Sequence, residues 1–347
     1  MYQQMETELT LTPVKIVHNA EILLPEESIG FNPRSTSQIV AKSPFIESNC
    51  ESVSMDHLKV ECVTPVFARC NSVTISHYDF ILALQECVAN FYIGEKIMNP
   101  EIRVSHKILG RIQEALKKPK AELLPHDETI YWERIAVAIE IPSITMVVGG
   151  NTLSLVVGVV RSFHNQNLYS KKTAERFKLF AGFVNHVCTN TAVSTDGVLL
   201  DVKVFSLEEL KVQIYNLLNS YNMNNHVAQM RDLENYSLTQ SQFCQLIGRS
   251  RIYQHLPKET KATIPELLFN DGQINAISKA YLEDVNFKSD SNGEIDLWKM
   301  FNLLTGANKS SSYINDFLEK GINATNFING ISKAQADRNS PYSWFLS

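Results

Sequence analysis

The hydrophobic pattern of this 347-residue chain changes its period near Phe205. Before that residue, apolar side chains alternate with small or polar ones, as in IYWERIAVAIEI at 130–141. Alternation places one set of side chains on a single face of a strand. The next segment, ITMVVGGNTLSLVVGVVRSF at 144–163, predicts two more strands joined by a turn at Gly149-Gly150-Asn151, because glycine and asparagine tolerate the positive φ of a tight hairpin.

After Phe205 the apolar residues recur at helical spacing. Ser206 and Glu209 form a capping box that opens an amphipathic helix. Helical patterns then continue toward the C-terminus, with glycine and proline between them. Strands followed by a run of helices indicate the α+β class. We therefore predict a largely antiparallel sheet over about 57–205, followed by an α-helical C-terminal half.

Several helices, strands and turns are expected within this α+β arrangement. A helix is predicted over Tyr78–Tyr92, with Gly94 ending it. A turn at Asp196-Gly197 should divide the last two strands of the sheet. Four further apolar runs predict strands: residues 58–68, 72–76, 183–191 and 197–205.

Charge divides the chain into an arm and a body. Residues 1–56 hold eight acidic and three basic side chains, which account for the whole net charge of -5. Few apolar residues there have obvious partners, so we predict a mostly disordered acidic arm. The body would comprise a β-rich core over 57–205 and a helical region over 206–347, packed on or beside that core. Because this body is neutral, any binding to nucleic acid must use a local patch.

The cysteines and the apolar runs indicate in which cellular compartment the protein is expected. None of the six cysteines forms a CxxC pair, so a zinc ribbon is not supported and no metal site is predicted. The first ten residues are polar and acidic, unlike a signal peptide. The most apolar run, 144–160, is interrupted by glycine and is rich in β-branched residues, unlike a membrane helix. We expect a soluble cytoplasmic protein without a membrane partner.

The stretch Thr305–Ser310 resembles half of a phosphate-binding loop. The glycine that should precede Lys309 is replaced by Asn308, and a helix rather than a strand comes before the stretch. We therefore predict a corner between two helices, with Gly306 as a left-handed C-cap. Under that interpretation, replacing Gly306 with alanine destabilises the protein and replacing Lys309 leaves stability unchanged.

Other motifs give no positive sign of a site. A calcium loop around Gly293 would require acids where Lys288 and Lys299 stand. Residues 238–256 resemble a DNA-reading helix-turn-helix, but polar residues replace its apolar anchors, so a core helix is favoured. His186 and Cys188 are expected on one strand face without further metal ligands. No catalytic residue and no cofactor is predicted, and whether the chain is an enzyme is left open, with a non-enzymatic role favoured.

Two short segments are strongly basic. The first spans 103–120 and the second 168–178, where the charges are flanked by Phe163, Tyr169, Phe177 and Phe180. Lysine and arginine beside stacking rings suit the backbone and bases of a single strand, although solvated loops have the same composition. The nine residues proposed to contact nucleic acid are Arg103, Lys107, Arg111, Lys117, Lys118, Tyr169, Lys171, Lys172 and Arg176.

A family resemblance covers nearly all of the body. IRVSHKILGRIQEALKKP, NLYSKKTAERFKLFAGFVNHVCTNT and LWKMFNLLTGANKSSSYINDFLEKGINA resemble motifs of a domain-of-unknown-function family found on conjugative transposons, plasmids and prophages of Bacteroidetes. The Val-Cys-x-Asn motif at 187–190 and the Trp298-x-x-x-Asn302 helix are similar to a broader phage/plasmid-like family. A second cysteine usual after the first motif is missing here. The resemblance implies a mobile-element setting, but it implies no activity and no site residues.

Three functions are compatible with these observations. The leading hypothesis is a non-enzymatic accessory factor that binds single-stranded DNA in replication or recombination of a mobile element. The second is a protein-interaction or regulatory module whose partner is a host or element-encoded protein. The third is an enzyme of unknown chemistry. Salt-dependent binding to oligonucleotides distinguishes the first from the second, and a deep pocket with convergent polar groups favours the third.

Overall fold

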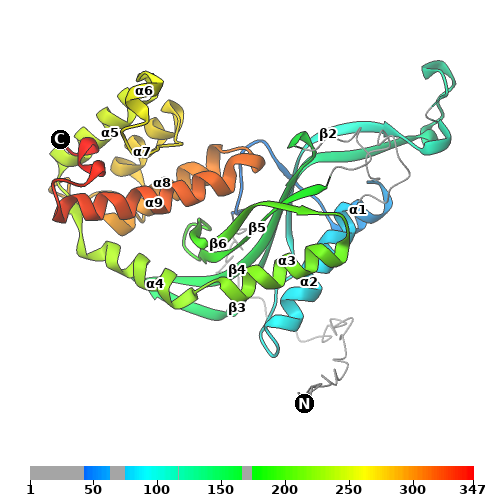
Figure 1. Ribbon diagram of the computed structural model, residues 1–347, viewed down its shortest axis with the longest axis horizontal. Helices are drawn as coiled ribbons and strands as arrows, with labels where there is room; N and C mark the ends of the chain where they lie inside the picture. The colour runs from blue at the N-terminus through cyan, green and yellow to red at the C-terminus, as the bar shows by residue number, and fades with distance from the viewer. Residues whose placement is uncertain (1–42, 63–74, 116, 166–173) are drawn as a thin grey trace, which may run out of the picture. The chain divides into compact units, whose positions relative to one another are not determined.

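The computed structural model describes residues 43–62, 75–115, 117–165 and 174–347. A six-stranded sheet precedes a helical C-terminal half (Figure 1), so the predicted α+β class is confirmed. The sheet follows chain order and each neighbouring pair is antiparallel. Its strands are β1 (Glu51–Ser52), β2 (Glu101–Arg111), β3 (Glu128–Val148), β4 (Asn151–Ser162), β5 (Glu175–Asn185) and β6 (Thr191–Val204).

Among the described residues, the first half contains the α-helices α1 (Met55–Val60) and α2 (His77–Phe91). A small ribbon of β7 (Ser237–Leu238) and β8 (Ile295–Asp296) lies among the helices of the second half. Those helices are α3 (Leu207–Ser220), α4 (Met223–Asp232), α5 (Gln240–His255), α6 (Lys258–Lys261), α7 (Asp271–Glu283), α8 (Leu297–Ser311) and α9 (Phe317–Ala336). Ser206 caps α3 as expected, because its side chain accepts a hydrogen bond from the Glu209 N–H.

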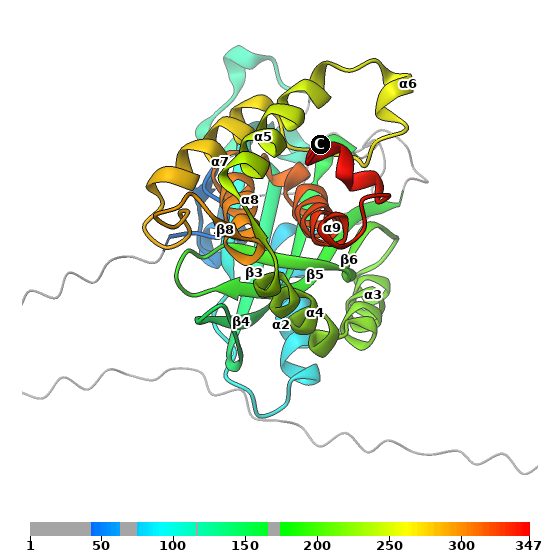
Figure 2. The ribbon, with the colours of Figure 1, turned by 90° about the vertical axis from the view of Figure 1, so that its left-hand side faces the viewer.

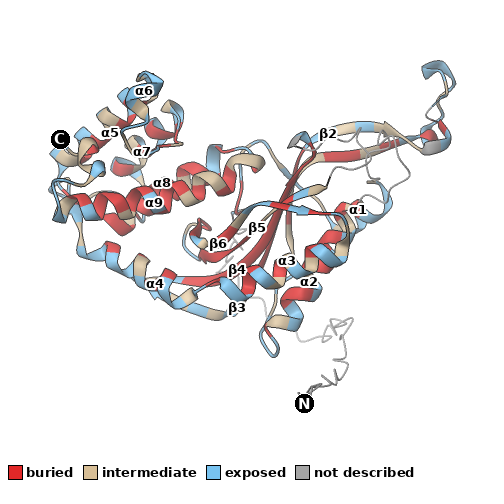
Figure 3. Cartoon of the chain, viewed as in Figure 1, coloured by how far each residue is buried: buried red, intermediate tan, exposed pale blue. Residues whose placement is uncertain are grey.

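The sheet is covered on both faces. Figure 2 shows α2 and α3 on one side of it and α8 and α9 on the other. Residues such as Val137 and Val157 belong to the large core that includes α2 and α3. Residues whose side chains lie on the opposite face of the sheet, such as Ala138 and Phe180, form a smaller core with Phe317. Buried residues therefore form a nearly unbroken series along β4 and β5 (Figure 3), which explains the nearly continuous apolar sequence of these strands.

The strand boundaries differ from the prediction in two places. The expected strands at 130–141 and 144–148 form one strand, β3, whose pairing with β4 shifts between Ile141 and Thr145. Pro142 lies in that irregularity, where a residue without an N–H is tolerated. The turn expected at Asp196-Gly197 is also wrong, because β6 runs through both residues with irregular pairing to β5. The Gly149-Gly150 turn is confirmed, with φ values of 55° and 73°.

The segment before the sheet also departs from expectation. Residues 55–60, of which 58–60 were predicted to begin a strand, form α1, because the Ser54 side chain caps the N–H of His57 and a helix follows. Most of the predicted strands at 58–68 and 72–76 lies outside the described residues. Within the proposed 1–56 arm, Phe45 and Ile46 are buried and β1 pairs with β2. The division into arm, core and helical region otherwise stays a prediction.

The helix corner predicted at Gly306 is wrong. Gly306 lies inside α8, which continues to Ser311, and its φ is not positive. A Cβ added at Gly306 would lie 3.4 Å from the Asn190 side-chain nitrogen, which is an ordinary contact distance. By contrast, α5 is continuous through Gly248 and buries Phe243 and Leu246, so the core-helix interpretation of 238–256 is confirmed.

The Gly306→Ala substitution should therefore stabilise the protein, by roughly 0.5–1 kcal/mol, because alanine loses less backbone entropy in a helix. Chemical denaturation at neutral pH measures the difference. Gly248→Ala is a matched substitution in α5, where an added Cβ meets nothing within 4 Å. If Gly306→Ala lowers the free energy of unfolding while Gly248→Ala raises it, the contact with Asn190 is tighter than the structure indicates.

Candidate functional site

The first candidate region is one end of the large sheet. Because neighbouring strands are antiparallel, the connection from β2 to β3 and the junction of β4 with β5 lie at the same end. Pairing between β3 and β4 includes Arg134 with Ser162 at this end, so residues 128–133 of β3 project beyond β4 together with their partners in β2. At roughly 3.3 Å per residue, residues 128–133 correspond to a projection of about 20 Å. Figure 1 shows the hairpin of β2 and β3 extending beyond the rest of the sheet. Arg111, at the end of β2 in the first basic segment, and residues 174–178 of the second segment thus lie at the same end of the sheet.

Several predicted contact residues are engaged within the protein. The Arg103 guanidinium donates to the Cys50 carbonyl at 3.0 Å, beside β1. Lys118 donates to both carboxylate oxygens of the buried Asp127 at 2.9 Å. Arg111 donates to the Lys118 carbonyl at 2.6 Å. The Arg103 contact holds the segment beside β1, and the Arg111 and Lys118 contacts join parts of the connection between β2 and β3. These three side chains are therefore engaged in contacts that stabilise the fold.

The positive charge that remains exposed on the described part of the hairpin comes from lysines. Lys107 is exposed beside the Trp132 ring, 5.9 Å from its centroid, and Lys117 and Lys120 are exposed near the tip. Arg176, at the start of β5, is exposed and lies 3.8 Å from the Asp201 carboxylate. Tyr169, Lys171 and Lys172 lie outside the described residues.

Three of the four rings expected to stack on bases are in the core. Phe163, Phe177 and Phe180 are buried, so none of them offers a face to a base. Phe163 and Phe177 instead enclose the guanidinium of Arg161, at 4.3 and 4.8 Å from their centroids. Alternation within β5 explains the error, because the aromatic residues there point into the two cores.

Arg161 is the centre of a buried charged cluster at the same end of the sheet. Its side chain is fully buried, forms an ion pair with Glu175 and donates to the Ile75 carbonyl. The Ile75 N–H donates to the other Glu175 oxygen at 2.8 Å. Burial lowers the pKa of Arg161 to about 10, although the Glu175 carboxylate opposes that shift. This pair fixes the chain just before α2 against β4 and β5.

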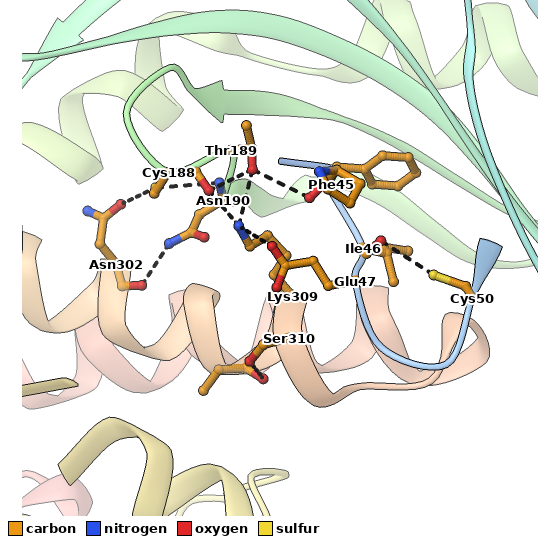
Figure 4. A network of polar contacts seen from close by, with 12 residues as sticks. Phe45, Ile46, Glu47, Cys50, Cys188, Thr189, Asn190, Asn302, Lys309 and Ser310 are labelled. Carbon is orange, nitrogen blue, oxygen red and sulfur yellow. Dashed lines mark hydrogen bonds and ion pairs between the residues drawn. The ribbon is translucent and has the colours of Figure 1, made fainter. Parts of the chain in front are cut away.

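A second candidate region surrounds Lys309, at the C-terminal end of α8 (Figure 4). Its ammonium group donates to the Cys188 carbonyl at 2.7 Å and to Thr189 Oγ1 at 3.2 Å. It also forms an ion pair with Glu47 at 3.0 Å, and the Glu47 N–H donates to the Lys309 carbonyl at 3.0 Å. Lys309 therefore joins α8, the turn after β5 and the segment before β1, and no phosphate loop is present there.

The two quoted short motifs meet in this region. Asn190 donates to the Asn302 carbonyl at 2.8 Å, and Asn185 donates to the Asn302 side-chain oxygen at 3.1 Å. Trp298 donates from its indole nitrogen to Asn151 at 3.1 Å. Thr189 holds a positive φ of 59°, which is rare for a threonine and indicates a tightly determined turn. The motif residues thus pin α8 to the sheet.

The turn after β5 corrects a further prediction. His186 and Cys188 were expected on one strand face, but β5 ends at Asn185 and both residues lie in the following turn. Burial raises the pKa of the Cys188 thiol to about 11, so the thiol is protonated at neutral pH and a poor nucleophile. Groups of three or more metal-binding side chains are absent from the part of the chain that the structure describes.

A serine, a histidine and a glutamate converge beside that turn, and sequence reasoning missed them because they come from separate strands. Ser154 of β4 contacts His186 Nε2, and the Glu140 carboxylate of β3 lies 3.3 Å from the same nitrogen. A nucleophilic triad requires the acid and the serine on opposite ring nitrogens. Because both groups share Nε2, the cluster has no relay geometry for activating Ser154.

Comparison with known proteins identifies the family. The model of a family described as "Domain of unknown function, B. Theta Gene description (DUF3871)" matches residues 26–346. The chain belongs to this family. The match confirms the predicted membership of a Bacteroidetes family of unknown function. No curated protein and no solved structure matches the chain.

The DUF3871 match includes both candidate regions, since it spans the hairpin of β2 and β3 as well as the Lys309 network. Helices of the length and apolar character needed to cross a bilayer do not occur among the described residues. The family description names no activity, so the chemistry of the two regions must support any functional proposal.

Proposed function

We propose that this DUF3871 protein binds single-stranded DNA as a non-enzymatic accessory factor in replication or recombination of a mobile element. The observation that supports the proposal is that the described parts of the two basic segments lie at the same end of the sheet. The projecting hairpin carries the exposed Lys107, Lys117 and Lys120. The second segment adds Lys171 and Lys172, which adjoin β5 in sequence. The mobile-element setting rests on the motif resemblance.

The proposed interface relies on phosphate contacts. With the three predicted ring platforms buried, base stacking there would depend on Tyr169, whereas the lysines can neutralise the backbone of any sequence. Five contacting lysines predict a log–log salt dependence with a slope of about -3.5, from about -0.7 for each neutralised phosphate of a single strand.

Reversing Lys117 and Lys120 to glutamate should weaken binding to every 40-mer single strand, by about tenfold or more at low salt, and should reduce the salt slope by about 1 for each lysine. Fluorescence anisotropy at several salt concentrations measures both quantities. The matched control reverses Lys258 and Lys288, which are exposed in the helical half. Equal weakening by both pairs would reduce the effect to net charge, and wild-type affinity in the first pair would exclude the hairpin as the interface.

A protein-interaction module is the second candidate, because two leucines are exposed on the same hairpin. Leu109 is 71% exposed and Leu124 is 51% exposed. Large exposed apolar side chains are a feature of docking surfaces for protein partners. Replacing both leucines with serine should leave single-strand affinity unchanged if the phosphate interface is correct. Loss of affinity with those serines, but not with the lysine reversals, would favour the interaction module.

A further inference from the structure

A cavity of about 210 Å³ lies between the sheet and the segment that precedes β1. Its apolar lining includes four buried side chains, which are Phe45, Ala138, Val156 and Val184. The exposed residues Met98 and Asn99 line it as well, so a ligand can enter from solvent on that side. A concave site with apolar walls and few polar groups is typical of small-molecule binding.

This cavity and the proposed DNA interface lie at opposite ends of the sheet. Glu101 and Val184 line the cavity, at the first residue of β2 and near the last residue of β5. Arg111 and Arg176 belong to the other ends of the same two strands. Binding of a ligand in the cavity is therefore independent of the proposed function, and it can be measured without DNA.

Two carboxylates in the cavity wall already have partners in the protein. Glu101 accepts a hydrogen bond from the Phe45 N–H at 3.2 Å. The Glu140 carboxylate lies 3.3 Å from His186 Nε2. A ligand that carries a charge would lose its hydration on entering this space, and groups engaged with one another replace that hydration poorly. The wall therefore favours an uncharged ligand.

A buried hydroxyl group gives an independent indication of a ligand. Thr191 lines the cavity and is 3% exposed, and its Oγ1 has no hydrogen-bond partner among the described residues. Buried polar atoms without a partner are rare in folded proteins because they have lost their hydrogen bonds to water. A threonine hydroxyl both donates and accepts, so a hydroxyl group on a ligand in the cavity supplies the missing partner.

We propose that the cavity binds a small uncharged molecule that has the size of one aromatic ring and bears a single hydroxyl group. The ring contacts Phe45, Val156 and Val184, and the hydroxyl group forms a hydrogen bond with Thr191. An apolar cavity of about 150 Å³ accommodates a benzene molecule. The larger volume of this cavity, about 210 Å³, leaves room for a ring with one substituent.

Titration of the full chain with phenol at pH 7, followed by ligand-observed NMR, tests the proposal. Phenol is uncharged at this pH, and toluene has the same number of non-hydrogen atoms without the hydroxyl group. Benzylammonium and benzoate carry a positive or a negative charge on the same ring. Both ions should bind at least about tenfold more weakly than phenol. Tighter binding of either ion, or no binding of phenol at millimolar concentration, would overturn the proposal.

Thr191→Val tests the hydroxyl contact. Valine keeps the shape of threonine and removes a hydroxyl group that has no partner, so the variant should fold. It should bind phenol about fivefold more weakly and toluene as tightly as before, since only phenol loses a hydrogen bond. The matched control is Thr152→Val, the same change at an exposed position of β4, which should alter neither affinity. Unchanged phenol affinity in Thr191→Val, or an equal loss for phenol and toluene, would contradict the proposal.

Ala138→Leu tests the location of the ring. The larger side chain occupies part of the cavity and should weaken the binding of both phenol and toluene by about tenfold or more. Unchanged binding of both compounds would show that they bind elsewhere on the protein. Thermal unfolding checks the fold of each variant, and Thr191→Val decides the question if the leucine variant is unfolded.

Discussion

Replacing Lys309 with methionine should lower the free energy of unfolding by about 2–3 kcal/mol. Methionine keeps the aliphatic volume but removes a charge that is 10% exposed and contacts Glu47, Cys188 and Thr189. The Glu47 carboxylate and the Cys188 carbonyl would both lose their donor. Because Glu47 is 37% exposed, water compensates part of the loss, and the expected cost lies below that of a fully buried ion pair.

Urea unfolding of both proteins at pH 7 measures this difference. Lys288→Met removes the same charge at an exposed position and should change stability by less than about 0.5 kcal/mol. Glu47→Gln should have a smaller effect than Lys309→Met, because glutamine can still accept from the ammonium group. A neutral Lys309→Met variant would mean that the contacts in Figure 4 contribute nothing net to folding.

The sequence alone predicted that replacing Lys309 leaves stability unchanged, and the contacts of Lys309 reverse that prediction. The Gly306-to-Ser310 stretch contains residues typical of a helix end, and local propensity alone favours a corner there. The partners that keep α8 helical come from far along the chain: Asn190 near Gly306, and Glu47 and Cys188 at Lys309. Local signals were overridden by tertiary contacts that no sequence spacing reveals.

The fold class was predictable because it depends on periodicity alone. The alternation at 130–141 and the capping box at Ser206 mark a strand and a helix in isolation. Bulges were not predictable in the same way. Pro142 interrupts an alternating pattern and resembles a strand end, yet β3 continues past it because β4 still pairs on both sides.

The candidate interface was only partly predictable. Clustering of lysine and arginine is visible in the sequence, but their partners are not. Lys118 is paired because Asp127, nine residues later, is buried beneath it. Glu140, Ser154 and His186 come from β3, β4 and the turn after β5, and their convergence depends on register, which composition does not determine.

Acidification should destabilise the protein through two buried histidines, His77 and His226. Burial lowers the pKa of His77 to about 3, and the Arg161 charge adds to that shift. Burial also lowers the pKa of His226 to about 4, although Asp196 opposes it. His77 donates from Nε2 to the Trp132 carbonyl at 2.8 Å. His226 shares a hydrogen bond of 2.8 Å with the Tyr221 hydroxyl. Both rings are therefore neutral in the folded protein at neutral pH.

In the unfolded chain both histidines take up a proton near pH 6.5, whereas the folded protein resists protonation until about pH 3 to 4. The unfolded state thus binds more protons in this window, and stability falls as the pH decreases from about 6.5. Between pH 7 and pH 5 the two groups together should cost about 3–4 kcal/mol of unfolding free energy. Urea unfolding at both pH values measures the loss, and His226→Gln should reduce it by about half whatever its own stability at pH 7. His126→Gln, at a side chain that is 71% exposed, should leave the loss unchanged; an equally large loss in the His226 variant would show that other groups titrate instead.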